Sequence, residues 1–223
     1  MPVSNSIKCF SFFEIVGFQQ VLPLLVQPLR IRIFAAQYQQ AMDLEEKSKA
    51  QKEAEKNRKL LEDLRSKDAE VVMRALNRTE KEGDHRAIPA MIDAMLNHPE
   101  TKVDAKVRLL LTQLKTTRSI EPLIAAINDP RTKPVRPLLV SAFWESGLDV
   151  NEYLLLFVSL ATRDSYLTCL ECLTVIENMA PPLPETDLEE GLEIVKEALE
   201  APDEKEDLLR SLQEVLQERV IEG

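Results

Sequence analysis

The chain has 223 residues with 38 acidic and 28 basic side chains, a formal net charge of −10, and only five glycines and three cysteines. Few, odd-numbered cysteines exclude a disulfide framework and favour a reducing compartment, so a cytoplasmic location is expected. Few glycines and aromatic residues, with abundant Leu, Ala and Glu, predict an all-α protein. Net acidity also argues against non-specific binding to nucleic-acid phosphates.

Residues 1–41 are apolar on average, but charged residues, glutamines and prolines interrupt them. A transmembrane helix needs about 18 apolar residues in succession, and no uncharged run of that length occurs here. Arg30 and Arg32 stand where a signal peptide approaches its cleavage site, which argues against a cleaved leader. We expect a poorly structured extension, for which an over-long gene start ahead of Met42 is one explanation. Contact with a membrane surface stays open as an alternative.

From Met42 to Lys67 the sequence is almost entirely Glu, Lys, Arg, Gln and Ala. Acid–base pairs four residues apart, among them Glu45–Lys49 and Arg58–Glu62, suit a solvent-exposed helix. Leucines appear only near the end of this stretch. We therefore expect residues 42–67 to form a charged helix whose end packs as an N-terminal cap on the domain that follows.

An internal repeat begins after this helix. A shift of 32 residues places the apolar positions of 88–95 on those of 120–127, and a shift of 33 carries 123–127 onto 156–160. A fixed period in this range is typical of helical repeat arrays, in which each unit buries its apolar face against its neighbours. We expect four units, each a pair of helices, over residues 68–97, 101–128, 134–161 and 165–201.

The stretch from Ile120 to Gly147 shows the pattern most clearly. A short apolar helix precedes a turn at Asp129-Pro130, and a second helix opens at Val135-Arg136 and ends at Ser146-Gly147. These residues resemble the turn and second-helix opening of the HEAT family, whose members are armadillo-like helical repeats. The resemblance implies an α-solenoid in which the Asp and the Arg brace the turns as a ladder between successive units.

Two later helices stand out by composition. Residues 153–161 (YLLLFVSLA) are apolar nearly all round and are expected to form the most buried element. Residues 181–223 contain 14 acidic and four basic side chains, so all the net charge of the chain lies there. The final helix, 203–220, has one apolar stripe and an acidic opposite face, as the terminal cap of a repeat array requires.

The predicted fold is therefore an all-α, right-handed α-solenoid of about four HEAT-like helix pairs. A polar N-terminal helix precedes it and an acidic C-terminal capping helix ends it. In domain terms, 1–41 is the extension, 42–67 the charged helix and 68–223 the HEAT-like repeat domain.

No catalytic, cofactor or metal site is expected. Cys169 and Cys172 have the spacing of a metal or redox motif, but no second ligand pair accompanies them, and both fall on the apolar stripe of a helix. His85 and His98 lie at helix-joining turns with no neighbouring nucleophile in a suitable setting. The sequence has no glycine-rich phosphate loop. A non-enzymatic protein is the resulting expectation.

A cluster of bases is the candidate for partner binding. Equivalent positions of a solenoid align along one face, so bases near the helix starts of units two and three are expected to form a ridge. This basic ridge consists of Lys102, Lys106, Arg131, Lys133 and Arg136. The expected function is a non-catalytic protein–protein interaction or scaffold module that presents its helical-repeat surface to a protein or peptide. Binding of nucleic acid by the ridge is the alternative, and surface charge without a partner is the third possibility.

Overall fold

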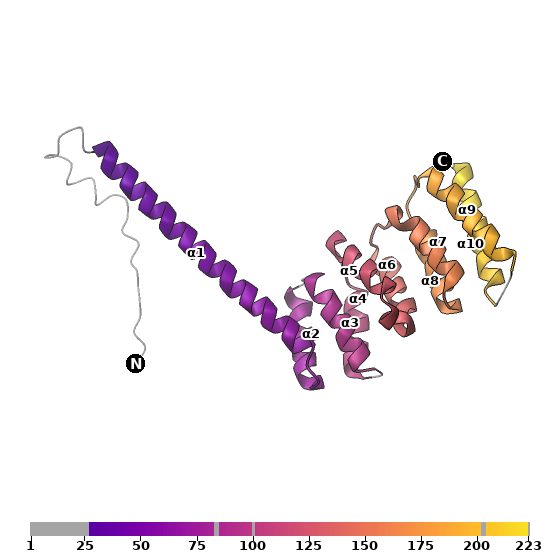
Figure 1. Ribbon diagram of the computed structural model, residues 1–223, viewed down its shortest axis with the longest axis horizontal. Helices are drawn as coiled ribbons and strands as arrows, with labels where there is room; N and C mark the ends of the chain where they lie inside the picture. Colours follow the sequence, from indigo (N-terminus) through magenta and orange to yellow (C-terminus); the bar gives the residue numbers. More distant parts are fainter. Residues whose placement is uncertain (1–26, 83–84, 100, 202–203, 223) are drawn as a thin grey trace. The chain divides into compact units, whose positions relative to one another are not determined.

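The computed structural model describes residues 27–82, 85–99, 101–201 and 204–222. These residues form ten α-helices and four short 3-10 helices, with no β-strand among them, so the all-α prediction is confirmed (Figure 1). The chain divides into two compact units, residues 1–57 and 58–223. The α-helices are α1 Gln27–Leu64, α2 Ala69–Glu82, α3 Ile88–Asn97, α4 Lys102–Leu111, α5 Ile120–Asn128, α6 Arg136–Ser146, α7 Leu154–Arg163, α8 Tyr166–Glu177, α9 Glu185–Leu199 and α10 Glu206–Glu222.

Helix α1 begins at Gln27 rather than near Met42. Residues 27–41, which the sequence assigned to a poorly structured extension, are therefore helical, and residues 1–26 lie outside the described residues. The physical reason is local: Pro28 is compatible with a first helical turn, and neither Gly nor Pro follows it before Leu64. Within the described part of the first unit, 42–57 is a charged, almost wholly exposed helix.

In the second unit, the end of α1 contributes to the core. Leu60 and Leu64 are buried, with 3% and 0% of their surface exposed. Arg78 of α2 forms a 3.8 Å ion pair with Asp63 next to this contact. The last turns of α1 thus pack on the helices that follow, where the leucines of the sequence begin.

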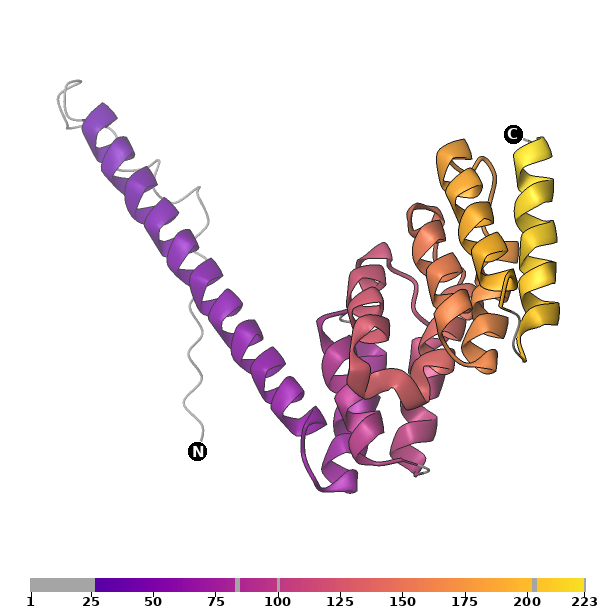
Figure 2. The same ribbon diagram turned by 45° about the vertical axis from the view of Figure 1, so that its right-hand side comes forward.

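Helices α2 to α10 pack beside one another in chain order (Figures 1 and 2). Four consecutive pairs pack closely, namely α3 with α4, α5 with α6, α7 with α8, and α9 with α10. Alternate helices also contact, so that α2, α4, α6, α8 and α10 form one layer, while α3 lies beside α5 and α7 beside α9 in the other. Each helix is therefore packed mainly against neighbours that are close in sequence.

The closely packed helix pairs are shifted by one helix relative to the four units predicted from the sequence. Those units grouped α2 with α3, α4 with α5, α6 with α7 and α8 with α9, whereas each close pair in the structure consists of the second helix of one unit and the first of the next. The Ile120–Gly147 stretch, read as one helix–turn–helix, does correspond to the α5/α6 pair. A repeat period alone cannot decide which of two neighbouring helices forms the closer pair, because both choices have the same period.

Polar contacts between successive parts of the array recur at a spacing close to the repeat. The His98 ring lies 3.2 Å from the Ser66 carbonyl oxygen, 32 residues away, and the Tyr153 hydroxyl donates to Glu121, again 32 residues away, at 2.7 Å. Asn151 donates to the Ala180 carbonyl at 2.6 Å over a spacing of 29 residues. These contacts join equivalent levels of neighbouring helix pairs.

The core of the second unit is continuous along the array. An aromatic contact in it joins Phe143 of α6 and Phe157 of α7, both fully buried, with ring centroids 5.4 Å apart in an edge-to-face arrangement. On α7 the buried residues are Leu154, Phe157, Val158 and Ala161, whereas Leu156 is only half-buried. The expectation that α7 is buried nearly all round is thus too strong. The buried residues Leu123 and Ile127 of α5 are followed 34 residues later by the buried residues Phe157 and Ala161, whereas the shift used in the sequence was 33.

The last helix is held by two basic side chains that reach back along the array. Lys205 is 4% exposed and donates to the Thr162 and Asp164 carbonyl oxygens, at 2.9 Å each. Arg219 donates to the Met179 and Glu177 carbonyl oxygens at 2.7 and 2.9 Å, next to the end of α8. These contacts align α10 with α8 at both ends and leave an acid-rich face of α10 in solvent.

Gly147 ends α6 in the left-handed region, with φ of 66° and ψ of 32°. A Cβ at this position would meet nothing within 4 Å, so a substitution costs backbone strain rather than a clash. We expect Gly147→Ala to lower the free energy of unfolding by about 1 kcal/mol and Gly147→Asn to lower it less, because Asn tolerates this conformation. Urea denaturation followed by circular dichroism measures both. Equal effects of the two substitutions would contradict this origin of the cost.

Candidate interaction surface

Three members of the predicted basic ridge are already bound to acids within the fold. Lys106 Nζ lies 2.7 Å from Glu80 Oε1, with 17% of its side chain exposed. Arg136 pairs with Asp164 in a largely buried contact. Arg131 pairs with Asp93 and Asp129. The charge of these three bases is therefore largely compensated before any partner arrives.

Lys102 and Lys133 are the exposed remainder of the basic ridge. Lys102 is the first residue of α4, and Lys133 lies in the 3-10 turn Pro130–Val135. Neither forms an ion pair within the residues the structure describes. Two exposed lysines on separate elements make a much smaller positive surface than the five bases expected from the sequence.

The turn before α6 is braced by Asp129 and Arg131. The Asp129 carboxylate accepts the Arg131 backbone N–H at 2.9 Å and its guanidinium at 2.9 and 2.7 Å, and Arg131 also reaches Asp93 of α3 at 3.2 Å. The Arg131 side-chain hydrogen bond holds the pKa of Asp129 below its usual value. Arg131, which was predicted to contact a partner, thus braces this turn, a role that the HEAT resemblance implied for Arg136.

Arg136 connects its own turn to the following helix pair. One guanidinium nitrogen bonds Asp164, which is 28 residues later, and another lies 3.4 Å from the Asp129 carbonyl oxygen. Burial favours protonation of Asp164, but the hydrogen bonds from Arg136 and the Ser165 N–H, with the charges of Arg136 and Lys133, hold the pKa of Asp164 below its usual value. The contact is therefore an ionised pair between successive turns.

The cysteines of α8 face the core. Cys169 and Cys172 both have no exposed surface. Burial raises the pKa of the Cys172 thiol well above its usual value, and the nearby Cys169, Asp164 and Glu171 add to the effect. No group of three or more His, Cys, Asp and Glu side chains arranged to hold a metal ion occurs in the described parts of the chain.

Because a thiolate is the reactive form, these two thiols should be inert in the folded protein. In a Cys9→Ser variant, which removes the remaining cysteine, we expect essentially no reaction with a thiol reagent such as DTNB at pH 8. Two equivalents should react in denaturant. Rapid reaction of the folded protein would contradict the burial of both side chains.

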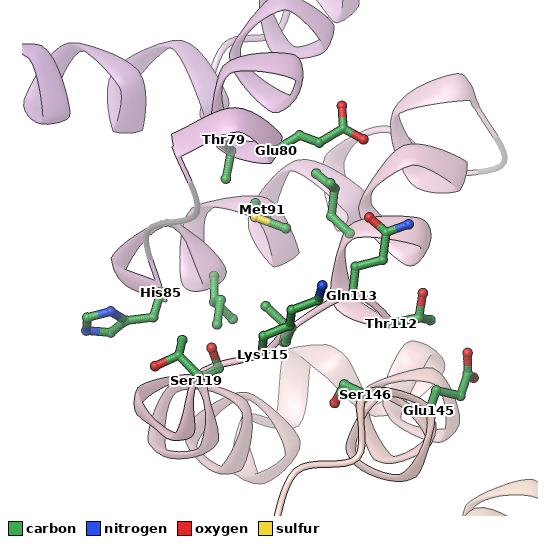
Figure 3. A pocket seen from close by; sticks show the side chains of 14 residues that line it. Thr79, Glu80, His85, Met91, Thr112, Gln113, Lys115, Ser119, Glu145 and Ser146 are labelled. Atoms are coloured by element: carbon green, nitrogen blue, oxygen red, sulfur yellow. The ribbon is translucent and has the colours of Figure 1, made fainter.

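A cleft of about 770 Å³ lies between the end of α2, the α4–α5 connection and the end of α6 (Figure 3). Figure 3 shows Lys115 in the middle of this cleft near Ser119, while His85 and Glu145 lie at opposite ends. The Ser119 hydroxyl is buried without a hydrogen-bond partner among the described residues. The lining of the cleft contains one lysine, one histidine, two glutamates and several neutral polar groups. The cleft therefore offers no matched set of charges for one kind of ligand.

The clearest exposed apolar surface lies on α6 and α8. Four large side chains that are between 38% and 59% exposed form what we call the α6/α8 patch. Its members are Trp144 of α6 and Tyr166, Leu167 and Leu170 of α8. The Trp144 indole N–H donates to Glu171 Oε2 at 2.9 Å, which holds the ring against α8. The sequence reading missed this patch, although α8 has more apolar residues than one buried stripe needs.

No protein-family model matches the chain, and searches of curated proteins and of solved structures likewise give no match. Among the helices described, none combines the length and the apolar character needed to span a bilayer. A function for this chain is therefore proposed from its own contacts and surfaces.

Proposed function

We propose that this protein is a non-catalytic interaction module, a right-handed HEAT-like α-solenoid that presents a helical-repeat surface to a protein or peptide partner in the cytoplasm. The observation that supports it most is the series of polar contacts spaced like the repeat, from Ser66–His98 to Glu121–Tyr153 and Asn151–Ala180. Contacts of this kind let helix pairs stack in chain order and build an extended surface.

The energetics of stacking explain why such a module suits binding. Each helix pair buries its apolar face against its neighbours, so the outward faces contribute little to stability and are available for recognition. Exposed apolar side chains scattered singly are normal, whereas a group on adjacent helices marks an interaction site. The α6/α8 patch is such a group.

Nucleic-acid binding by the basic ridge is the less favoured alternative. Affinity for phosphates grows with the number of cations that neutralise them. Three of the five ridge bases pair with acids of the same chain, and Lys102 and Lys133 remain. The experiment that tests the proposed function therefore also tests nucleic-acid binding.

The test is capture of a binding partner from native lysate with the full chain as bait. We expect one protein to be retained in near-stoichiometric amount by the folded chain and to be lost with a Leu123→Asp variant, whose fully buried position makes it a folding-defective control. Retention that disappears after nuclease treatment would favour the nucleic-acid alternative. Equal retention by both baits would reject the proposed function.

A further inference from the structure

We propose that the α6/α8 patch binds a basic, amphipathic α-helix of a partner protein, with one large apolar side chain of that helix seated in a cavity beside Trp144. This inference rests on the proposed function and specifies its surface and the chemistry of its partner.

The apolar part of the site follows the axis of α8. Tyr166, Leu167 and Leu170 lie in its first turns at helical spacing and share one exposed face, and Trp144 lies alongside, tied to Glu171. The described residues include eight large apolar side chains that are exposed, and half of them belong to this patch. The four are therefore a group on adjacent helices rather than apolar residues scattered singly over the surface. A face that runs along one helix and is flanked by another suits a partner helix with apolar residues at i, i+3, i+4 and i+7.

The patch continues into a cavity of about 240 Å³ between the end of α6 and the end of α8. Trp144 contributes to both the patch and the cavity lining, which also includes Phe143, Leu148, Val175 and Met179. This volume is below the roughly 300–1,000 Å³ of small-molecule pockets, so it suits a single anchoring side chain better than a cofactor. Well-packed aromatic or aliphatic anchors of this kind supply most of the binding energy in many interfaces.

The charge around the patch specifies a basic partner. Residues 148–223 contain 19 acidic and five basic side chains. Four of those bases are bonded within the fold: Lys196 to Glu193, Arg210 to Glu206, and Lys205 and Arg219 to backbone carbonyl oxygens. The fifth, Arg163, is exposed at the end of α7, so the acids still outnumber the exposed bases of this region.

Several acids are exposed on the helices that carry the patch and on α10. Glu145 and Glu177 are exposed at the ends of α6 and α8, and Asp207, Glu214 and Glu218 are exposed on α10, which packs against α8. An apolar patch on helices that also carry exposed acids complements a helix whose apolar stripe is bordered by Lys and Arg. Such charges set partner choice and orientation, and salt screens them over about 8–10 Å.

The experiment uses two synthetic helical peptides with the same leucine stripe and one Phe anchor, flanked by Lys and Arg in one and by Glu in the other. Trp144 is the only tryptophan of the chain, so with tryptophan-free peptides its fluorescence reports directly on the patch. We expect the basic peptide to shift Trp144 emission to shorter wavelength in a saturable way. The acidic peptide should bind at least about tenfold more weakly at physiological salt, and the difference should shrink in about 1 M salt.

A variant pair isolates the apolar contact. Leu167→Asp/Leu170→Asp adds two negative charges and removes the apolar surface. Because both positions are exposed, the protein should stay folded with helicity close to wild type, while affinity for the basic peptide falls at least about tenfold despite the added charge. Leu109→Asp on α4 is the matched control, since Leu109 is 46% exposed and outside the patch, and it should bind normally.

Several results would overturn the inference. These are equal affinity for both peptides, no saturable binding of the basic peptide, or unchanged binding by the Leu167→Asp/Leu170→Asp protein. A dimer in sedimentation that this double variant abolishes would assign the patch to a second copy of the chain instead. If the double variant still captures the partner from lysate, this surface is wrong while the proposed function stands. If the wild-type chain captures no partner, the proposed function itself fails.

Discussion

Replacing Phe157 with alanine should lower the free energy of unfolding of the second unit by about 3–5 kcal/mol, the usual cost of removing a fully buried aromatic side chain. Phe157 has no exposed surface and contacts Phe143 edge to face, so the substitution removes a pair interaction and leaves a cavity between α6 and α7. Because α7 also packs on α8 and α9, the loss should reach neighbouring helix pairs. Thermal melting should fall by about 10 °C or more.

Leu156→Ala on the same helix is the matched control. Leu156 is only half-buried, so its truncation should cost about 1–2 kcal/mol. Guanidinium denaturation of both variants, followed by circular dichroism, gives the comparison. If Leu156→Ala destabilises as much as Phe157→Ala, then α7 presents a different face to the core from the one described here.

The contrast between these two residues shows how far the sequence could predict the fold. Periodicity and turn residues predicted the helices of the array well, because Asp129-Pro130 and Gly147 stop helices for local reasons. Around α7, however, seven of the nine residues from 153 to 161 are large and apolar, so no polar face marks the side turned to solvent. Whether Leu156 points toward the core or toward solvent then depends on how the neighbouring helices pack, which only the structure shows.

The beginning of α1 was missed for a different reason. Residues 27–41 look unlike the charged stretch after Met42, and a change of composition was taken for a change of structure. Helix formation depends on the backbone, and after Pro28 good helix formers without Gly or Pro continue through both segments.

The candidate surface was predictable only in part. The sequence shows which bases are close together along the chain. Their ion pairs with Glu80, Asp93 and Asp164, however, join residues 26 to 38 positions apart, and no local sequence pattern predicts such pairs. The α6/α8 patch was hidden similarly, because an apolar residue on a helix is first assigned to the core. An excess of apolar residues over one stripe, as on α8, is the signal that could have revealed it.

Breaking the contact between Arg136 and Asp164 is expected to have the second large effect. The side chains of Arg136 and Asp164 are 13% and 4% exposed, and the pair joins the turn before α6 to the turn before α8. Arg136→Leu leaves a buried carboxylate with the Ser165 N–H but without its main partner, and uncompensated buried charges of this kind cost about 3–5 kcal/mol. Chemical denaturation at pH 7 measures the loss.

The loss of unfolding free energy in Arg136→Leu should depend on pH, in a direction set by the pKa of Asp164. In the wild-type protein the pKa of Asp164 is lowered, so its contribution to stability is present above the unfolded-state pKa of about 3.9 and is lost as pH falls through the lower folded value. In Arg136→Leu, burial should instead raise the pKa of Asp164, so that the charged form destabilises the fold as pH rises above about 4. The difference between wild type and variant should therefore be smaller near pH 4 than at pH 7.

A double variant separates the cost of an unpaired charge from the value of the pair. Arg136 Nε is buried without a hydrogen-bond partner among the described residues, so the ion pair does not fully offset the desolvation of its own members. Replacing both residues with leucine removes both charges, and such replacements of buried pairs are often near neutral. We expect Arg136→Leu/Asp164→Leu to be more stable at pH 7 than Arg136→Leu alone, and its stability relative to wild type to vary less with pH. A double variant as unstable as the single one would mean that Arg136 acts through its packing and its contact with the Asp129 carbonyl rather than through the charge of Asp164.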